Sequence, residues 1–404
     1  METSLRHRFL VVLASCPVVG LVGCGEVKGE APDQVDAAAE VVDASPETTV
    51  DAAPDTPDAS LPHNLAFVTS ETFTGNLGGR DGADAHCNRL AKAASREGNF
   101  RAYLSTDSED AITRISGARG WVRTDGLAVA DTADDIKASK MFRPIRFDET
   151  GKAVTTFEVW TATNNGIKFT TPPASYGTCA GWTTETPTVP NMPDVHPAAL
   201  VGDAGHSGTV MSFVRAFACT TRARLYCFQV DHNNPMPVEP APNARVAFVS
   251  TSTFTPGTGG LTAADDLCKR DAAAANRPGV FKAALATAGA SAKSRFLASD
   301  GPWKRLDGAL LAPTTEALFD DNREMDAALE IDATGVFRSS DGIYLGARGF
   351  STAGTDAAST CANWTVADTA LTPGRRAASA RKDSFGVSCG SPRRLMCLET
   401  SAAP

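Results

Sequence analysis

The sequence predicts an α+β fold in which one disulfide-bonded domain occurs twice, in tandem, behind a disordered acidic stalk. Two observations lead to this prediction. Blocks of similar sequence recur in the same order in both halves of the 404-residue chain, and four cysteines recur with them. In each copy a helical pattern comes first and a run of strand patterns follows, which is typical of α+β folds rather than of alternating βαβ units.

Residues 1–23 have the pattern of an export signal. Arg6 and Arg8 precede the apolar run FLVVLASCPVVGLVG (9–23), which is too short to serve as a mature membrane-spanning helix. No later segment contains the roughly 18 apolar residues that a span requires. The sequence therefore predicts an exported chain that does not thread the membrane.

The apolar run ends in Leu-Val-Gly-Cys (21–24), which resembles the lipobox of bacterial lipoproteins. The resemblance implies that Cys24 is the lipid-modified first residue of the mature chain, so that the membrane is a partner through this anchor. An ordinary signal peptide cleaved at Gly23 is the alternative. Gly25 rather than an aspartate follows Cys24, which favours the outer membrane or cell surface under the usual sorting logic.

Residues 24–63 predict a disordered Ala/Asp/Pro-rich stalk. They contain ten acidic residues, one lysine and no Phe, Trp or Tyr, so they cannot bury enough apolar surface to form a core. Binding of a cation or a basic partner to this acidic run is the alternative. From Asn64 onward 35 basic residues face 36 acidic ones, so the formal net charge of −9 belongs to the stalk. We expect no nucleic-acid binding, which requires a basic face.

The two copies are expected at 64–230 and 245–400, joined by a Pro- and Asn-rich linker at 231–244. Matching blocks include LAFVTSETFTG (65–75) and VAFVSTSTFTPG (246–257), RTDGLAV (123–129) and RLDGALL (305–311), and CAGWT (179–183) and CANWT (361–365).

Each copy predicts one leading helix and several strands. AFVTS, AFVST and EVWTAT are strand-type runs, and RTDGLAV and RLDGALL each predict a strand, an Asp-Gly turn and a second strand. Apolar residues at helical spacing surround Cys87 and Cys268. Thr262 followed by Asp265 resembles a capping box, which predicts that the leading helix of the second copy begins at Thr262.

Eight cysteines lie in the copies: Cys87, Cys179, Cys219 and Cys227 in the first, and Cys268, Cys361, Cys389 and Cys397 in the second. Even numbers at matched spacing in an exported protein predict disulfides, although spacing leaves three connectivities open in each copy. A zinc site would require C-x-x-C pairs or Cys-His clusters, which the copies lack, so we expect no metal on these cysteines.

A first cysteine on a helix, a Trp-containing strand and three further cysteines, the last two separated by seven residues, resemble the C-type lectin-like fold and the related endostatin-like domain. FVTSETFTGNLGGRDGADAHC, VWTAT, CAGWT and LYCF are similar to a domain of unknown function from bacterial surface lipoproteins that is placed in this fold. The resemblance implies nested bridges in each copy: Cys87–Cys227 around Cys179–Cys219, and Cys268–Cys397 around Cys361–Cys389.

Calcium is the one cofactor that the resemblance brings into consideration. Sugar-binding members of the group hold it with Glu-Pro-Asn or Gln-Pro-Asp and with Trp-Asn-Asp before the third cysteine, because calcium requires a dense set of oxygen ligands. Neither motif precedes Cys219 or Cys389. We therefore expect no cofactor.

The loop TTETPTVPNMPDVHPAALVGDAGHSG (183–208) of the first copy contains four side chains of metal-ligand type: Asp194, His196, Asp203 and His206. They could form a metal or polar-ligand site in a loop held by a disulfide. A solvated loop rich in turn-forming residues is the preferred interpretation. Trp182 and Trp364 could stack on a sugar ring, but tryptophans in small disulfide-bonded domains are more often core residues, which is the interpretation we prefer for both.

The sequence contains no G-x-S-x-G elbow, H-E-x-x-H helix or phosphate-binding loop, and the second copy contains no histidine. We expect no enzyme activity. The expected function is display of two non-catalytic binding or adhesion domains for an extracellular glycan, matrix component or surface protein. A purely structural envelope protein, or an extracellular hydrolase that uses the 183–208 loop, is the alternative.

Overall fold

The computed structural model describes residues 61–164, 166–168, 177–186, 198–236, 243–296, 301–338, 341–356, 358–376 and 384–401. Contacts place all of these residues in one compact unit. The expected signal, the lipid site Cys24 and most of the stalk lie outside the described residues. Within the described part, no helix is long and apolar enough to cross a membrane.

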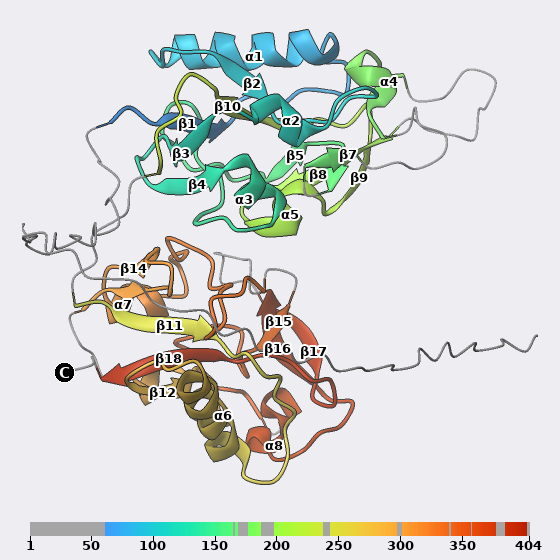
Figure 1. Cartoon of the computed structure of the whole chain (residues 1–404). Coiled ribbons are helices and arrows are strands. Elements are labelled where there is room, and N and C mark those ends of the chain that lie inside the picture. The colour runs from blue at the N-terminus through green and yellow to red at the C-terminus, as the bar shows by residue number, and fades with distance from the viewer. Residues whose placement is uncertain are drawn as a thin grey trace, which may run out of the picture. The chain divides into compact units, whose positions relative to one another are not determined.

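The first half of the described chain, residues 61–236, is a mixed α+β structure dominated by a sheet (Figure 1). The sheet has the strand order β4-β3-β1-β10-β5-β8-β9, and β2 also pairs with β10. The helix α1 contacts β2 and β10. The elements are β1 (Asn64–Val68), α1 (Gly79–Ala93), β2 (Phe100–Ala102), α2 (Ala111–Ile115), β3 (Arg119–Arg123), β4 (Ala128–Thr132), α3 (Ala133–Lys137), β5 (Glu158–Trp160), β6 (Thr163–Asn164), β7 (Ile167–Lys168), α4 (Cys179–Trp182), β8 (Ala198–Asp203), α5 (Gly208–Ser212), β9 (Arg215–Ala218) and β10 (Arg224–Gln229).

The second half, residues 243–401, has the same succession of a strand, a long helix and further strands. Its sheets have the orders β12-β18-β11-β13-β14 and β15-β16-β17, and a parallel bridge between Ile343 and Arg394 joins them. The elements are β11 (Arg245–Val249), α6 (Gly260–Ala274), β12 (Val280–Ala283), the 3₁₀ turn η2 (Lys293–Arg295), β13 (Trp303–Lys304), β14 (Leu310–Ala312), α7 (Thr315–Phe319), β15 (Gly342–Tyr344), η3 (Ala358–Thr360), α8 (Cys361–Trp364), β16 (Leu371–Arg376), β17 (Phe385–Ser388) and β18 (Met396–Ser401).

Four disulfides connect these elements in the nested order that the resemblance implied. The outer bridges, Cys87–Cys227 and Cys268–Cys397, tie α1 to β10 and α6 to β18. The inner bridges are Cys179–Cys219 and Cys361–Cys389. Each bridge restricts the unfolded chain; in the loop-entropy account this stabilises the fold by about 4 kcal/mol for each inner bridge and about 5 kcal/mol for each outer bridge.

The repeated Cys-x-x-Trp sequence forms a left-handed turn, seen as α4 and α8. The φ angles are +49°, +54°, +67° and +67° from Cys179 to Trp182, and +51°, +51°, +53° and +70° from Cys361 to Trp364. Left-handed backbone costs about 1–2 kcal/mol for each residue with a Cβ. Such a turn persists only where its surroundings enforce it.

Both ends of the left-handed turn are held by the core. The first residue of each turn is the inner-disulfide cysteine. At the other end, the fully buried indoles of Trp182 and Trp364 each donate a 2.8 Å hydrogen bond, to the carbonyls of Ser105 and Ala286. Hence the sequence motif recurs because it encodes this strained turn and its two anchors.

The prediction that the leading helix of the second copy begins at Thr262 is wrong. The helix α6 begins at Gly260, after Gly259 in a left-handed conformation, so Thr262 lies within its first turn. The carboxylate of Asp265 accepts a 2.9 Å hydrogen bond from the backbone N–H of Ala283 and pairs with Arg295 at 2.6 Å. A tertiary contact to β12 therefore takes the carboxylate that the capping box would have used.

Residues 231–236, expected as linker, are bonded to the first half. The backbone N–H of Asp231 donates to Asn64 Oδ1 at 3.0 Å, and that of Met236 donates to Asp131 Oδ1 at 2.8 Å. The beginning and end of this half therefore lie together.

We predict that Ala180→Gly raises the free energy of unfolding by about 0.5–1 kcal/mol. Ala180 is exposed with φ +54°, so loss of its Cβ relieves left-handed strain in excess of the added chain entropy. Urea denaturation measures the change. The control Ala85→Gly, at an exposed position of the right-handed helix α1, should lower the free energy of unfolding by about 0.5–1 kcal/mol. Equal losses in both variants would contradict the left-handed assignment.

We predict that the contribution of Glu330 to the free energy of unfolding falls as pH rises from about 4.5 to about 8. Glu330 is fully buried, which raises its pKa to about 8 although Arg305 at 3.2 Å opposes the shift. Between those pH values the folded state holds a proton that the unfolded state has released, so the contribution of Glu330 declines by up to about 1.4 kcal/mol per pH unit. Glu330→Gln should flatten this slope relative to Glu316→Gln, which removes an exposed carboxylate. An unchanged slope would show that Glu330 is ionised when folded.

Candidate functional site

The two candidate tryptophans lie in the core. The Trp182 ring packs edge-on against Trp160 with centroids 5.9 Å apart, and the Trp364 ring packs against Tyr344 at 5.3 Å. All four rings are fully buried beside the disulfides. Neither Trp182 nor Trp364 therefore presents a face on which a sugar could stack.

The other four candidates do not form a described site. Asp194 and His196 lie outside the described residues. Asp203, at the end of β8, and His206 are close, with Oδ1 and Nδ1 3.2 Å apart, but His206 is buried. Among the residues that the structure describes, no group of three or more His, Cys, Asp and Glu side chains could hold a metal ion.

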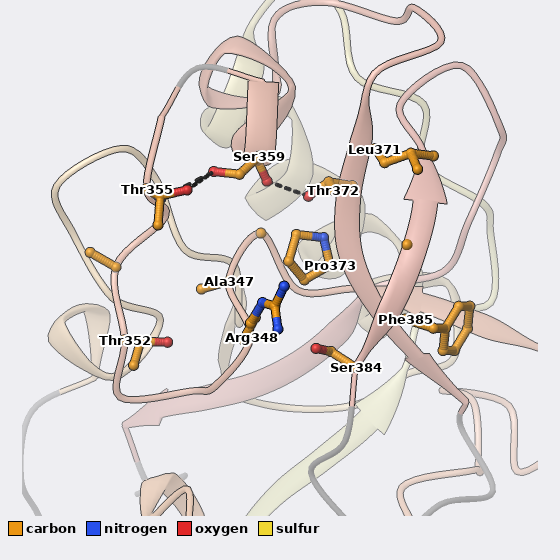
Figure 2. Close-up of a pocket in the computed structure, with 13 residues that line it drawn as sticks. Ala347, Arg348, Thr352, Thr355, Ser359, Leu371, Thr372, Pro373, Ser384 and Phe385 are labelled. Carbon is orange, nitrogen blue, oxygen red and sulfur yellow. Dashed lines mark hydrogen bonds between the residues drawn. The ribbon is translucent and has the colours of Figure 1, made fainter.

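A pocket of about 530 Å³ lies in the second half, against β16 and β17 (Figure 2). Four segments line it: 346–348 after β15, positions 352–359 before the left-handed turn, 371–373 in β16, and 384–386 at the start of β17. Its size is within the range of small-molecule sites. The pocket lies beside the left-handed turn at Cys361–Trp364, whose first residue forms the inner disulfide.

One wall of the pocket depends on Trp364. Gly346 has φ +80°, and a Cβ there would lie 2.6 Å from Trp364 Cζ2 and 2.7 Å from the carbonyl oxygen of Ala286. The N–H of Gly346 donates to the carbonyl of Pro373 at 3.1 Å. Only glycine lets the chain pass this close to the buried indole, so the left-handed turn positions this part of the pocket.

A second wall is held by Ser359. Its hydroxyl oxygen accepts 3.1 Å hydrogen bonds from the backbone N–H groups of Thr355 and Asp356, and its carbonyl accepts a 2.6 Å hydrogen bond from the Thr372 hydroxyl on β16. Thr352 bonds to the backbone of Gly349 in a similar way. This loop is therefore fixed against the sheet before any ligand arrives.

Arg348 supplies the charge of the pocket. Among the described residues that line the pocket it is the only one with a charged side chain; it is exposed and forms no ion pair with the described residues. Figure 2 shows its guanidinium in the view between Thr352 and Pro373. The Asp321 carboxylate holds the adjoining turn by accepting hydrogen bonds from the N–H groups of Phe350 and Ser351. The Arg348 donors consequently remain available to a ligand.

Two apolar side chains are exposed beside the pocket. Leu371 on β16 is 63% exposed and Phe385 on β17 is 44% exposed. The ladder register puts Phe385 opposite Gly374, at the position where Arg215 lies opposite Val201 in the first half. In the first half this position holds a charged residue, Arg215, which forms an ion pair with Glu158. The apolar rim thus distinguishes the two halves.

The sequence patterns did not predict this pocket. Its lining comes from segments whose proximity is set by the sheet and by the inner disulfide. The local signal was GIYLGAR (342–348), which replaces EVWTAT of the first copy and ends in the glycine-dependent bend and the free arginine.

Comparison with known proteins assigns no family: no protein-family model matches the chain, and no curated protein matches it in sequence.

We predict that Gly346→Ala destabilises the protein by more than 2 kcal/mol and disrupts the pocket, because the new Cβ clashes with Trp364 and with backbone. Gly335→Ala is the matched control, since Gly335 has φ +90° but a Cβ there meets open space. It should cost only the backbone strain, about 1–2 kcal/mol. Chemical denaturation measures both. Equal losses would show that the contact with Trp364 is loose.

Proposed function

We propose that the chain is a lipid-anchored cell-envelope protein with two non-catalytic domains of C-type lectin-like kind, and that its second half binds an extracellular ligand in the pocket beside Arg348. The lipobox-like sequence before Cys24 supports the anchor. The nested disulfides and the shared succession of elements support the fold and the tandem arrangement.

The pocket carries the functional proposal. It combines one unpaired cation, several hydroxyl-bearing side chains and two exposed apolar side chains in a space of about 530 Å³. Concave sites with an apolar lining and a few polar groups are typical of ligand binding. A free guanidinium and a rigid wall favour recognition of a small solute.

The composition of the lining favours binding over catalysis. Arg348 is the only ionisable side chain among those lining residues that the structure describes. Acid–base or nucleophilic chemistry requires a second group that takes or gives a proton. A positive charge also disfavours a metal ion nearby, so we propose that binding does not require calcium.

A structural envelope role is the second candidate. The exposed pair Leu371 and Phe385 is also what a neighbouring protein would cover. A hydrolase that uses the 183–208 loop gains no support from the described residues, since His206 is buried against Asp203.

We expect the full chain in detergent micelles to bind on an array of glycans and matrix proteins equally in calcium and in chelator. Phe385→Ala should weaken the signal about tenfold or more by removing apolar contact area. The control Val280→Ala truncates a 48% exposed side chain on β12, outside the pocket, and should change nothing. Loss of the signal in chelator would contradict the calcium independence. A signal that Phe385→Ala leaves intact would exclude this pocket, and an array without any signal would favour the structural role.

A further inference from the structure

We infer that the ligand of this pocket is an acidic sugar and that the Arg348 guanidinium binds its carboxylate. This inference rests on the proposed function, because it names the ligand class of the same site.

The first step is the state of Arg348. Its five N–H donors have a planar arrangement that matches the two oxygens of a carboxylate. Arg295 and Arg305 are mostly or wholly buried and pair with Asp265 and Asp307. Arg348 is exposed and forms no ion pair with the described residues, so water meets its donors when the pocket is empty. A carboxylate that enters the pocket can replace this water with charge-assisted hydrogen bonds.

The second step is the charge balance of the pocket. No carboxylate is among the described residues that line it, so none of these residues offsets the positive charge. The nearest fixed turn uses the Asp321 carboxylate for the backbone of Phe350 and Ser351. A ligand with one negative charge balances Arg348 and accepts charge-assisted hydrogen bonds from it, whereas the hydroxyl oxygens of a neutral sugar accept weaker ones.

The third step is the remainder of the lining. Phe385 and Leu371 present apolar surface at the rim, and the hydroxyls of Thr352, Thr355 and Ser384 come from the facing segments (Figure 2). The Thr352 and Thr355 hydroxyls donate to Gly349 and Ser359, so toward a ligand they act as acceptors. A sugar ring has an apolar C–H face and a polar edge of hydroxyls, which is the same division. Aromatic side chains pack on such faces while their neighbours meet the polar groups. A uronic acid adds the carboxylate that Arg348 requires.

The test is calorimetric titration of the full chain in detergent micelles. Three probes of equal length are used: an oligosaccharide of glucuronic acid, its neutral glucose counterpart and a sulfated glucose counterpart. The glucuronic acid probe should bind about tenfold or more tightly than the neutral one, and its affinity should fall as salt rises.

Variants assign the effect to the side chain. Arg348→Gln should weaken binding of the acidic probe about tenfold or more and leave that of the neutral probe unchanged, and Arg348→Lys should restore only part of the loss. The control Arg270→Gln removes an exposed arginine of α6, outside the pocket, and should have no effect. Thermal unfolding of each variant confirms that it is folded.

Four results would overturn the inference. Equal affinity for the acidic and neutral probes, or acidic binding that Arg348→Gln leaves intact, would exclude the carboxylate contact while the pocket remains a binding site. Tighter binding of the sulfated probe would show that the pocket prefers a sulfate ester to a carboxylate. Binding of none of the three probes would exclude acidic sugars, and the array signal and its loss in Phe385→Ala would then decide the proposed function separately.

Discussion

The left-handed turn that ends in tryptophan is the constraint on which the rest of each half depends. Four consecutive residues with positive φ are unfavourable for L-amino acids, so the turn exists only because a disulfide holds its first residue and a buried, hydrogen-bonded indole holds its last. The same anchors join the turn to the sheet. The strain of the turn is thus offset by the core that the turn helps to complete.

The two halves share the left-handed turn and its two anchors, and they differ at the surface of the neighbouring strands. Trp160 and Tyr344 occupy matching places against the buried indoles. At the strand edge, however, the ion pair of Arg215 with Glu158 in the first half gives way to the exposed ring of Phe385 in the second. Charged side chains on an edge strand disfavour association with another protein, whereas exposed apolar side chains favour it. A common interior is therefore compatible with different ligands in the two halves.

The pocket obtains its rigidity from the left-handed turn with its anchors, and its chemistry from the loops. Gly346 lies against Trp364, and Ser359 fixes the loop beside the turn, so these walls are set before binding. Arg348 and Phe385 project from these supports and supply charge and apolar area. Such a division between a fixed interior and variable loops lets the specificity of a binding protein change at little cost in stability.

The sequence by itself determined the α+β class, the succession of a helix and strands, and the set of eight cysteines, because these features follow from local periodicity and from counting. The order of the bridges came from a family resemblance, since spacing alone left three choices. The tertiary structure decided what local patterns cannot contain. Asp265 matches a capping box but bonds to β12, and Gly346 reads as a simple turn residue until Trp364 and Ala286 are seen beside it. Both outcomes depend on contacts between residues that are distant in the chain, which explains why the pocket became visible only in the fold.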